Sequence, residues 1–134
     1  MIILREYRDD DFKEVRYILD QEKIEDLNLE GIINVVLDNE KLIGVGKVKL
    51  EDDKYFLKYL IIKEEERNKG FGDALIRAIL YKLENRNVNK LYFNGNNDYL
   101  FKKGFKREIK ETLSIDIKTF FNDPCNCSGE CYGI

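Results

Sequence analysis

The sequence predicts one mixed α+β domain, in which a central mixed sheet of about seven strands is flanked by about four helices. Segments with a helical period and segments with strand-like patterning follow one another along the chain, and polar turns early and late indicate hairpins. A strand, a helix and another strand stand at the centre, which is the order of a parallel crossover unit. The length of 134 residues fits a single domain.

The apolar spacing and the turn signals place the individual elements. In chain order they are a strand over 2–8, helices over 10–22 and about 24–31, strands over 32–37, 42–50 and 55–62, a helix over 71–86, a strand over 91–93, a helix over 98–103, and strands over 105–109 and 113–118. The strand over 55–62 is apolar on both faces apart from Lys58, so we expect it in the middle of the sheet. Asp98 is expected to cap the helix that it begins, and Gly104 to end it.

The composition excludes several classes of function. The net charge of −3 argues against a general nucleic-acid-binding protein, which needs a basic surface. No apolar run approaches the ~18 residues of a membrane span, and the N-terminus lacks the layout of a signal peptide, so we expect no membrane partner and a cytoplasmic location. The chain has no histidine, which removes Ser-His-Asp and Cys-His nucleophile systems of the usual kind.

The three cysteines lie in the last ten residues, where the composition changes. We therefore divide the chain into a domain over 1–121 and a Cys-containing tail over 122–134. Cys125, Cys127 and Cys131 have three interpretations: a reduced tail, a disulfide or redox role, or a metal site completed by a fourth ligand. We expect no metal, and the role of the tail stays open.

A glycine-bearing segment, Arg67-Asn68-Lys69-Gly70-Phe71-Gly72, lies between the apolar strand over 55–62 and the long helix. The first N–H groups of a helix lack intrahelical acceptors, and glycines let the backbone approach an anion closely. The segment therefore predicts an anion site or, alternatively, an ordinary helix start. The P-loop lysine followed by Ser or Thr is absent, and Leu75 stands where the dinucleotide fingerprint needs its third glycine.

The sequence around this segment resembles the acetyl-CoA motif of the GNAT superfamily of N-acetyltransferases. The matching residues are Leu60-Ile61-Ile62-x4-Arg67-x-x-Gly70-x-Gly72. A second element, Asp98-Tyr99-Leu100-Phe101-Lys102-Lys103-Gly104-Phe105, is similar to the later motif of the family, an aromatic-rich short helix that ends on Gly-Phe. The element order resembles the family over about residues 2–121, which implies a GNAT-like fold and acetyl-CoA as co-substrate.

The resemblance implies roles for particular residues. Backbone N–H groups from Arg67 to Asp73 would hold the pyrophosphate, the end of the strand at Leu60–Ile62 would pair with the pantetheine arm, and an N–H near Ile62 would polarise the acetyl carbonyl. Lys69, Arg77 and Lys103 are candidates for the remaining phosphate charge, and Asn94 and Asn96 compete for the place of an asparagine of the family. The predicted cofactor-binding residues are Leu60, Ile61, Ile62, Arg67, Asn68, Lys69, Gly70, Phe71, Gly72, Asp73, Asn94 and Lys103.

The catalytic groups match the family less closely. The family often carries a tyrosine, which protonates the departing thiolate, at the position of Leu100. Tyr99 is one residue away, so it is predicted either as this acid or as a core aromatic. Phe56 stands where some members carry a basic glutamate. The remaining candidates for the base are Glu30, Glu51 and Asp52, acting directly or through water, and each has the alternative of a solvated surface carboxylate.

Together these features predict an N-acetyltransferase that transfers an acetyl group from acetyl-CoA to a primary amine by direct attack. The acceptor is a small amine, an amino-acid derivative, or a protein or peptide amine, and the resemblance implies substrate contacts from loops around 20–31 and 105–118. The alternatives are a non-catalytic acyl-CoA-binding or regulatory module and a metal- or redox-sensing protein that depends on the tail. A homodimer is left open.

Overall fold

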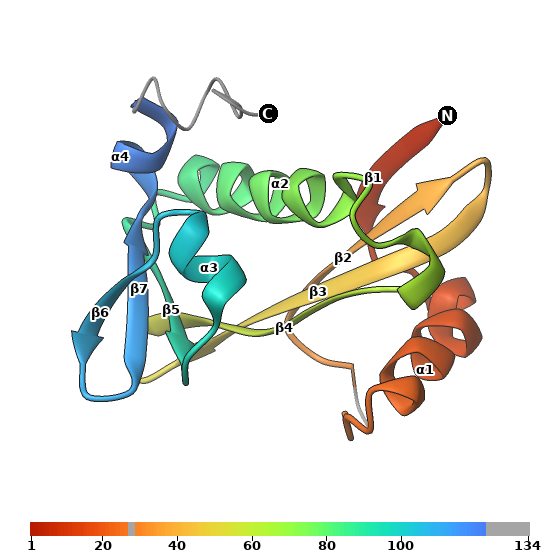
Figure 1. The fold of residues 1–134 in the computed structure, drawn as a ribbon, viewed down its shortest axis with the longest axis horizontal. Coiled ribbons are helices and arrows are strands. Elements are labelled where there is room, and N and C mark those ends of the chain that lie inside the picture. The colour runs from red at the N-terminus through yellow and green to blue at the C-terminus, as the bar shows by residue number, and fades with distance from the viewer. Residues whose placement is uncertain (27–28, 123–134) are drawn as a thin grey trace. The chain divides into compact units, whose positions relative to one another are not determined.

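The computed structural model describes residues 1–26 and 29–122 and confirms the predicted fold class. In these residues seven strands form one mixed sheet in the order β1-β2-β3-β4-β5-β7-β6, so β4 is the central strand, as its apolar faces predicted. The strands and helices in chain order are β1 (Ile2–Glu6), α1 (Phe12–Gln21), β2 (Ile32–Asp38), β3 (Lys41–Glu51), β4 (Lys54–Ile62), α2 (Phe71–Asn85), β5 (Lys90–Asn94), α3 (Asp98–Lys102), β6 (Lys106–Ile109), β7 (Thr112–Asp116) and α4 (Ile117–Asn122) (Figure 1).

The contacts divide the chain into two compact units. The first unit comprises Met1–Lys49 and Leu57–Ile79, and it contains β1, β2, α1, most of β3, the C-terminal part of β4 and the first turns of α2. The second comprises Leu50–Phe56 and the chain from Leu80 onward. No helix in the described ranges is long and apolar enough to cross a membrane.

In the first unit, the two helices cover opposite faces of the strands (Figure 1). The α1 face holds a buried cluster that includes Val15 and Leu19 of α1, Val45 of β3 and Ile61 of β4. On the α2 face the strands carry glycine: a Cβ at Gly46 would lie 2.8 Å from Ile79 Cδ1 and 2.9 Å from Leu60 Cδ1. The absence of a side chain there lets α2 pack directly on β3 and β4.

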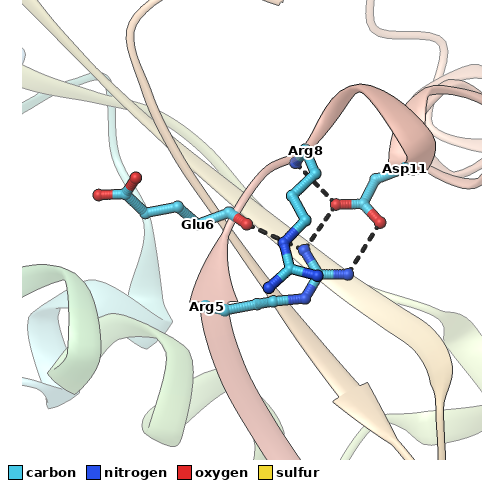
Figure 2. A network of polar contacts seen from close by, with 4 residues as sticks. All are labelled: Arg5, Glu6, Arg8 and Asp11. Carbon is cyan, nitrogen blue, oxygen red and sulfur yellow. Dashed lines mark hydrogen bonds and ion pairs between the residues drawn. The ribbon is translucent and has the colours of Figure 1, made fainter.

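The start of α1 is held by an acidic turn. A single 3-10 turn, Asp9–Asp11, precedes the helix, and the carboxylate of Asp11 accepts a hydrogen bond from the Arg8 backbone N–H at 2.8 Å (Figure 2). The guanidinium of Arg5 on β1 donates to both oxygens of the same carboxylate, at 2.8 and 3.0 Å. These bonds fix the helix start against the edge strand.

In the second unit, β5 pairs with the N-terminal residues of β4 in parallel and with β7 antiparallel, and β6 completes the late hairpin with β7. The predicted crossover through α2 is thereby confirmed, because β4 and β5 run in the same direction. Leu91, Leu100 and Leu113 are buried in this unit.

Three local predictions are wrong. Residues 22–26 and 29–31 form no helix, so the expected helical piece over 24–31 is absent from the described part of that segment. The last strand ends at Asp116 rather than 118, because the Asp116 carboxylate accepts the Thr119 N–H at 2.9 Å and starts α4 at Ile117. Asn97, not Asp98, caps α3, since its side-chain oxygen accepts the Leu100 N–H at 3.1 Å.

Candidate active site

The connection between β4 and α2 is a turn that leads directly into the helix. Directly after β4, the Lys63 backbone N–H donates a hydrogen bond to Ile43 O of β3 at 2.8 Å. A 3-10 turn over Glu64–Glu66 follows, and the Arg67 N–H donates to Glu64 O at 3.3 Å. The backbone N–H of Arg67 is therefore used within the turn, and the N–H groups that can meet an anion begin after it.

The glycine-bearing segment has the backbone form that the anion interpretation requires. Asn68 and Gly70 both have left-handed backbone, with φ of 65° and 89°. A Cβ built at Gly70 has no neighbouring atom within 4 Å, so the space beside this residue is open. The first intrahelical bond runs from the Ala74 N–H to Gly70 O at 3.1 Å, so the N–H groups of Phe71, Gly72 and Asp73 belong to the first turn of α2. This concave backbone with a helix N-terminus is a suitable anion site.

The three cations predicted near this segment all have carboxylate partners. Arg67 Nη2 lies 2.9 Å from Glu22 Oε2, and its Nε donates to Ile62 O at 2.8 Å. Lys69 Nζ pairs with Glu66 at 3.2 Å, and Arg77 Nε pairs with Asp73 at 2.9 Å. The backbone amides, with the helix dipole, are therefore the principal electropositive feature of the segment.

The predicted contact residues Leu60, Ile61 and Ile62 form the C-terminal end of β4, in the first unit, immediately before the turn that leads to the anion segment. The backbone of a strand can pair with an extended ligand, which then lies beside it as an added strand.

A hollow of about 120 Å³ lies beside the same strand end, on the α1 face. Ile61 and Ile62 line it together with Tyr17, Ile18, Gln21 and Glu22 of the α1 region. Lys63, Glu64 and Glu65 complete the lining. The lining thus has three carboxylates, those of Glu22, Glu64 and Glu65, and one ammonium group, and this excess of negative charge favours a cationic group.

A buried polar cluster on the α1 face was not predicted from the sequence. Asp26 Oδ2 accepts a hydrogen bond from Lys47 Nζ at 2.7 Å and another from the Tyr59 hydroxyl at 2.8 Å. Burial raises the pKa of Asp26, but the hydrogen bonds from Lys47 and Tyr59 outweigh it, and the pKa lies below its ordinary value. Burial, with the hydrogen bond to Asp26, raises the pKa of the Tyr59 phenol strongly, so this phenol stays protonated.

A signal for this cluster was present in the sequence. Lys47 has the same strand parity as Val45 and Ile43, so it points to an apolar face of β3. A lysine on a buried face needs a carboxylate partner, and Asp26 supplies it.

The second unit contains the predicted acid and its neighbours. Leu100, at the position of the family tyrosine, is buried, whereas Tyr99 is 38% exposed. The interpretation of Tyr99 as a core aromatic is therefore wrong. Lys103 Nζ lies 5.5 Å from the centroid of the Tyr99 ring, which brings a cation next to this phenol.

The two asparagines that compete for one predicted role differ in their contacts. Asn94 ends β5, and its side-chain oxygen accepts from the Thr112 hydroxyl at 3.2 Å. The side-chain oxygen of Asn96 accepts from the guanidinium of Arg107. The side chains of Asn94 and Asn96 are thus both bonded to the β6–β7 hairpin.

The candidates for the base are dispersed. Glu51 ends β3, and Asp52, with φ of 51°, belongs to the turn before β4, so both precede the strand whose other end leads to the anion segment. Glu30 is exposed in the first unit. This placement disfavours Glu51 and Asp52 as groups that act at the end of β4.

Metal-binding groups of three or more His, Cys, Asp or Glu side chains are absent from residues 1–26 and 29–122. Cys125, Cys127 and Cys131 lie outside the described residues, so the interpretations of the tail stay predictions.

Comparison with known proteins agrees with this geometry. The family model described as "Acetyltransferase (GNAT) family" matches residues 1–105. No curated protein matches the sequence.

Solved structures with similar folds include several acetyltransferases. The ribosomal-protein-S18-alanine N-acetyltransferase from Escherichia coli aligns with a TM-score of 0.71 and 14% identity, over 87% of this chain and 94% of that chain. The PaiA N-acetyltransferase from Thermoplasma acidophilum, in complex with coenzyme A, aligns with a TM-score of 0.70 and 14% identity, over 87% and 99%. A GNAT-family acetyltransferase from Brucella melitensis, in complex with acetyl-CoA, aligns with a TM-score of 0.68 and 17% identity, over 87% and 88%.

Proposed function

The chain belongs to the GNAT family of acetyltransferases and is an acetyl-CoA-dependent N-acetyltransferase, and from this premise we propose that it acetylates a primary amine by direct attack on the thioester. The acceptor is a small amine, an amino-acid derivative, or a peptide or protein amine. Proximity and orientation of the two reactants supply much of the rate acceleration in such a transfer.

The observation that carries this proposal is the left-handed backbone at Asn68 and Gly70, directly before the first turn of α2. We place the pyrophosphate of acetyl-CoA on the N–H groups that follow Arg67, up to Asp73. The pantetheine arm then pairs with the backbone of β4 at Leu60–Ile62, which brings the acetyl group next to the same strand. Lys69 and Lys103 are the proposed cationic contacts, and Asn94 is the proposed polar contact.

The chemistry requires a neutral amine and a proton for the leaving group. The amine nitrogen attacks the acetyl carbonyl carbon, the carbon–sulfur bond breaks, and coenzyme A leaves as a thiolate that takes up a proton. An N–H near Ile62 would stabilise the oxyanion that forms during attack. Tyr99 is the proposed proton donor, with water as the alternative, and water also serves to remove the proton from the amine.

Release of the coenzyme A thiol tests the proposal. The full chain is incubated with acetyl-CoA and, separately, with lysine, spermidine, and a short peptide with a free N-terminus, while the free thiol is followed colorimetrically. Amine-dependent release with formation of the N-acetyl product supports the proposal. Acetyl-CoA binding without amine-dependent release for any of these probes would contradict it.

A further inference from the structure

A second hollow lies in the second unit, where β4 begins. Its volume is about 710 Å³, which is in the range of pockets that hold small molecules, about 300–1,000 Å³. Its walls are the turn before β4 with the first residues of that strand, the connection from α2 to β5, the start of β5 and the end of β7. All of the lining residues belong to the second unit, and the proposed function uses none of them.

The connection from α2 to β5 is held by backbone hydrogen bonds, so this wall of the hollow is fixed. At the end of α2, the Val88 N–H donates to Leu83 O at 3.0 Å across Asn87, whose left-handed backbone has φ of 63°. This bond uses one of the helix-terminal carbonyls, which would otherwise repel an anion. Asn89 O accepts the Ile117 N–H at 2.9 Å, which joins the connection to the start of α4.

Positive charge exceeds negative charge in the lining. The lining cations are Lys54, Arg86 and Lys90, and the lining carboxylates are Asp53 and Asp116. Because three cations stand against two carboxylates, the hollow carries an excess of one positive charge, which favours an anionic ligand.

Some of these charged groups already have partners within the protein. The Asp116 carboxylate accepts the Thr119 N–H at 2.9 Å, and Lys90 Nζ lies 3.5 Å from Glu108 Oε2. Arg86, in contrast, is exposed, and its side chain forms no hydrogen bond or ion pair with the residues that the structure describes. A guanidinium can donate two parallel hydrogen bonds to a carboxylate. Arg86 is therefore the group of the lining that is best suited to hold such an anion.

The hollow also has an aromatic side. The half-buried ring of Tyr92 lines it, and the ring of Phe56 lies beside Tyr92 with 5.6 Å between the centroids. Lys54 Nζ lies 5.2 Å from the centroid of the Tyr92 ring. A ligand ring that packs beside Tyr92 therefore has an ammonium group next to it, to which an acidic substituent of that ring can bind.

We propose that this hollow is a binding site for a small aromatic carboxylate. The carboxylate lies between Lys54 and Arg86, and the ring of the ligand packs on Tyr92. A single negative charge on the ligand balances the single positive excess of the lining. The site does not depend on acetyl transfer, so it stands or fails independently of the proposed function.

Titration of the isotopically labelled full chain with phenylacetate, followed by the amide signals in nuclear magnetic resonance, tests the inference. Phenylacetate is expected to give saturable shifts on the amides of Lys54, Tyr92 and residues 86–90, with a Kd on the order of 1 mM. Three further probes isolate the parts of the ligand: phenylacetamide lacks the charge, acetate lacks the ring, and phenyl phosphate carries a different acid. Phenylacetamide and acetate should each bind about tenfold more weakly or less.

A double variant, Lys54→Gln with Arg86→Gln, removes the two cations that are proposed to hold the carboxylate. The matched control is Lys106→Gln with Lys118→Gln, which removes the same charge from two exposed lysines of the second unit that do not line the hollow. The Kd for phenylacetate is expected to rise about tenfold or more in the first variant and to stay within about twofold of the wild type in the control.

Several results would overturn the inference. They are an absence of saturable shifts at the hollow, shifts confined to the amides of Asn68–Asp73, and equal Kd values for phenylacetate and either phenylacetamide or acetate. Tighter binding of phenyl phosphate at the same amides, or an equal rise of the Kd in both variants, would also overturn it.

Discussion

At the scale of single residues, the carboxylate of Asp26 links stability to pH. The hydrogen bonds from Lys47 and Tyr59 hold its pKa below the ordinary value in spite of burial. A carboxyl whose pKa is lower in the folded than in the unfolded state stabilises the fold above the unfolded pKa of about 4, and the stabilisation is lost as the pH falls through the folded pKa. We predict that the free energy of unfolding falls between pH 5 and pH 3, which lie about one unit either side of the unfolded pKa. The loss, measured by urea titration, should be smaller in the variant Asp26→Leu with Lys47→Met than in the wild type. Equal losses would contradict this assignment.

The carboxylate of Asp11 makes a second single-residue prediction. The hydrogen bond from Arg5 lowers its pKa, and its side chain is nearly buried where β1 meets the start of α1 (Figure 2). Asp11→Asn is expected to lower the free energy of unfolding by about 2 kcal/mol, because the guanidinium loses its charged partner. The exposed neighbour Asp10 provides the control, and Asp10→Asn should change the same quantity by less than about 0.5 kcal/mol. Similar values for both variants would show that the ion pair does not stabilise the helix start.

At the scale of elements, the start of α2 depends on the backbone of Gly70. Its φ of 89° is strained for any residue with a Cβ, and the open space beside it is where we place the pyrophosphate. Gly70→Ala is predicted to cost about 1 kcal/mol of stability and to raise the Kd for acetyl-CoA by about tenfold, measured by calorimetry.

The control for backbone strain is Asn87→Ala, at an exposed turn after α2 with φ of 63°. It should lose comparable stability and keep the wild-type Kd for acetyl-CoA. An unchanged Kd in Gly70→Ala, or an equal rise in both variants, would speak against a role of the Gly70 backbone in binding.

The close approach of α2 to the sheet gives another prediction at this scale. A side chain at Gly46 would meet Ile79 and Leu60 at less than 3 Å, so α2 would have to move. Gly46→Val is expected to lower the free energy of unfolding by about 1–3 kcal/mol through overpacking. Lys49→Val, on the exposed part of the same strand, should be neutral within about 0.5 kcal/mol in the same urea titration. An unchanged free energy of unfolding in Gly46→Val would show that the packing of α2 on the sheet does not require a glycine at this position.

Most elements could be predicted because their patterns are local. The central place of β4 followed from its two apolar faces, and α2 from its helical period. The end of β7 could not be predicted, because Ile117 continues the alternation of Leu113 and Ile115 while the Asp116 side chain starts a helix. An alternation of apolar and polar residues indicates which side chains are buried, and Ile117 is buried in α4 as it would have been in a strand.

The candidate site could be predicted from the sequence to different degrees. The left-handed backbone of Gly70 agrees with the glycine of the motif. Asp26 is bonded to Lys47 and Tyr59, which lie 21 and 33 positions away in the chain, and such pairing depends on tertiary structure. In the sequence, only Lys47, a lysine on an apolar strand face, indicated this buried polar cluster.

At the scale of the whole molecule, family membership establishes the class of reaction, and the acceptor depends on local features that the fold does not determine. The cytoplasmic location and the domain limit at 121 stay predictions, and a homodimer and the role of the cysteine tail stay open.

The central claim is that the backbone from Asn68 to Asp73 and the end of β4 bind acetyl-CoA. Titration of the isotopically labelled full chain with coenzyme A, followed by the amide signals in nuclear magnetic resonance, tests it most directly. The account predicts that the largest shifts fall on the amides of Asn68–Asp73 and Leu60–Ile62. Binding of coenzyme A that leaves these amides unshifted while others move would contradict it.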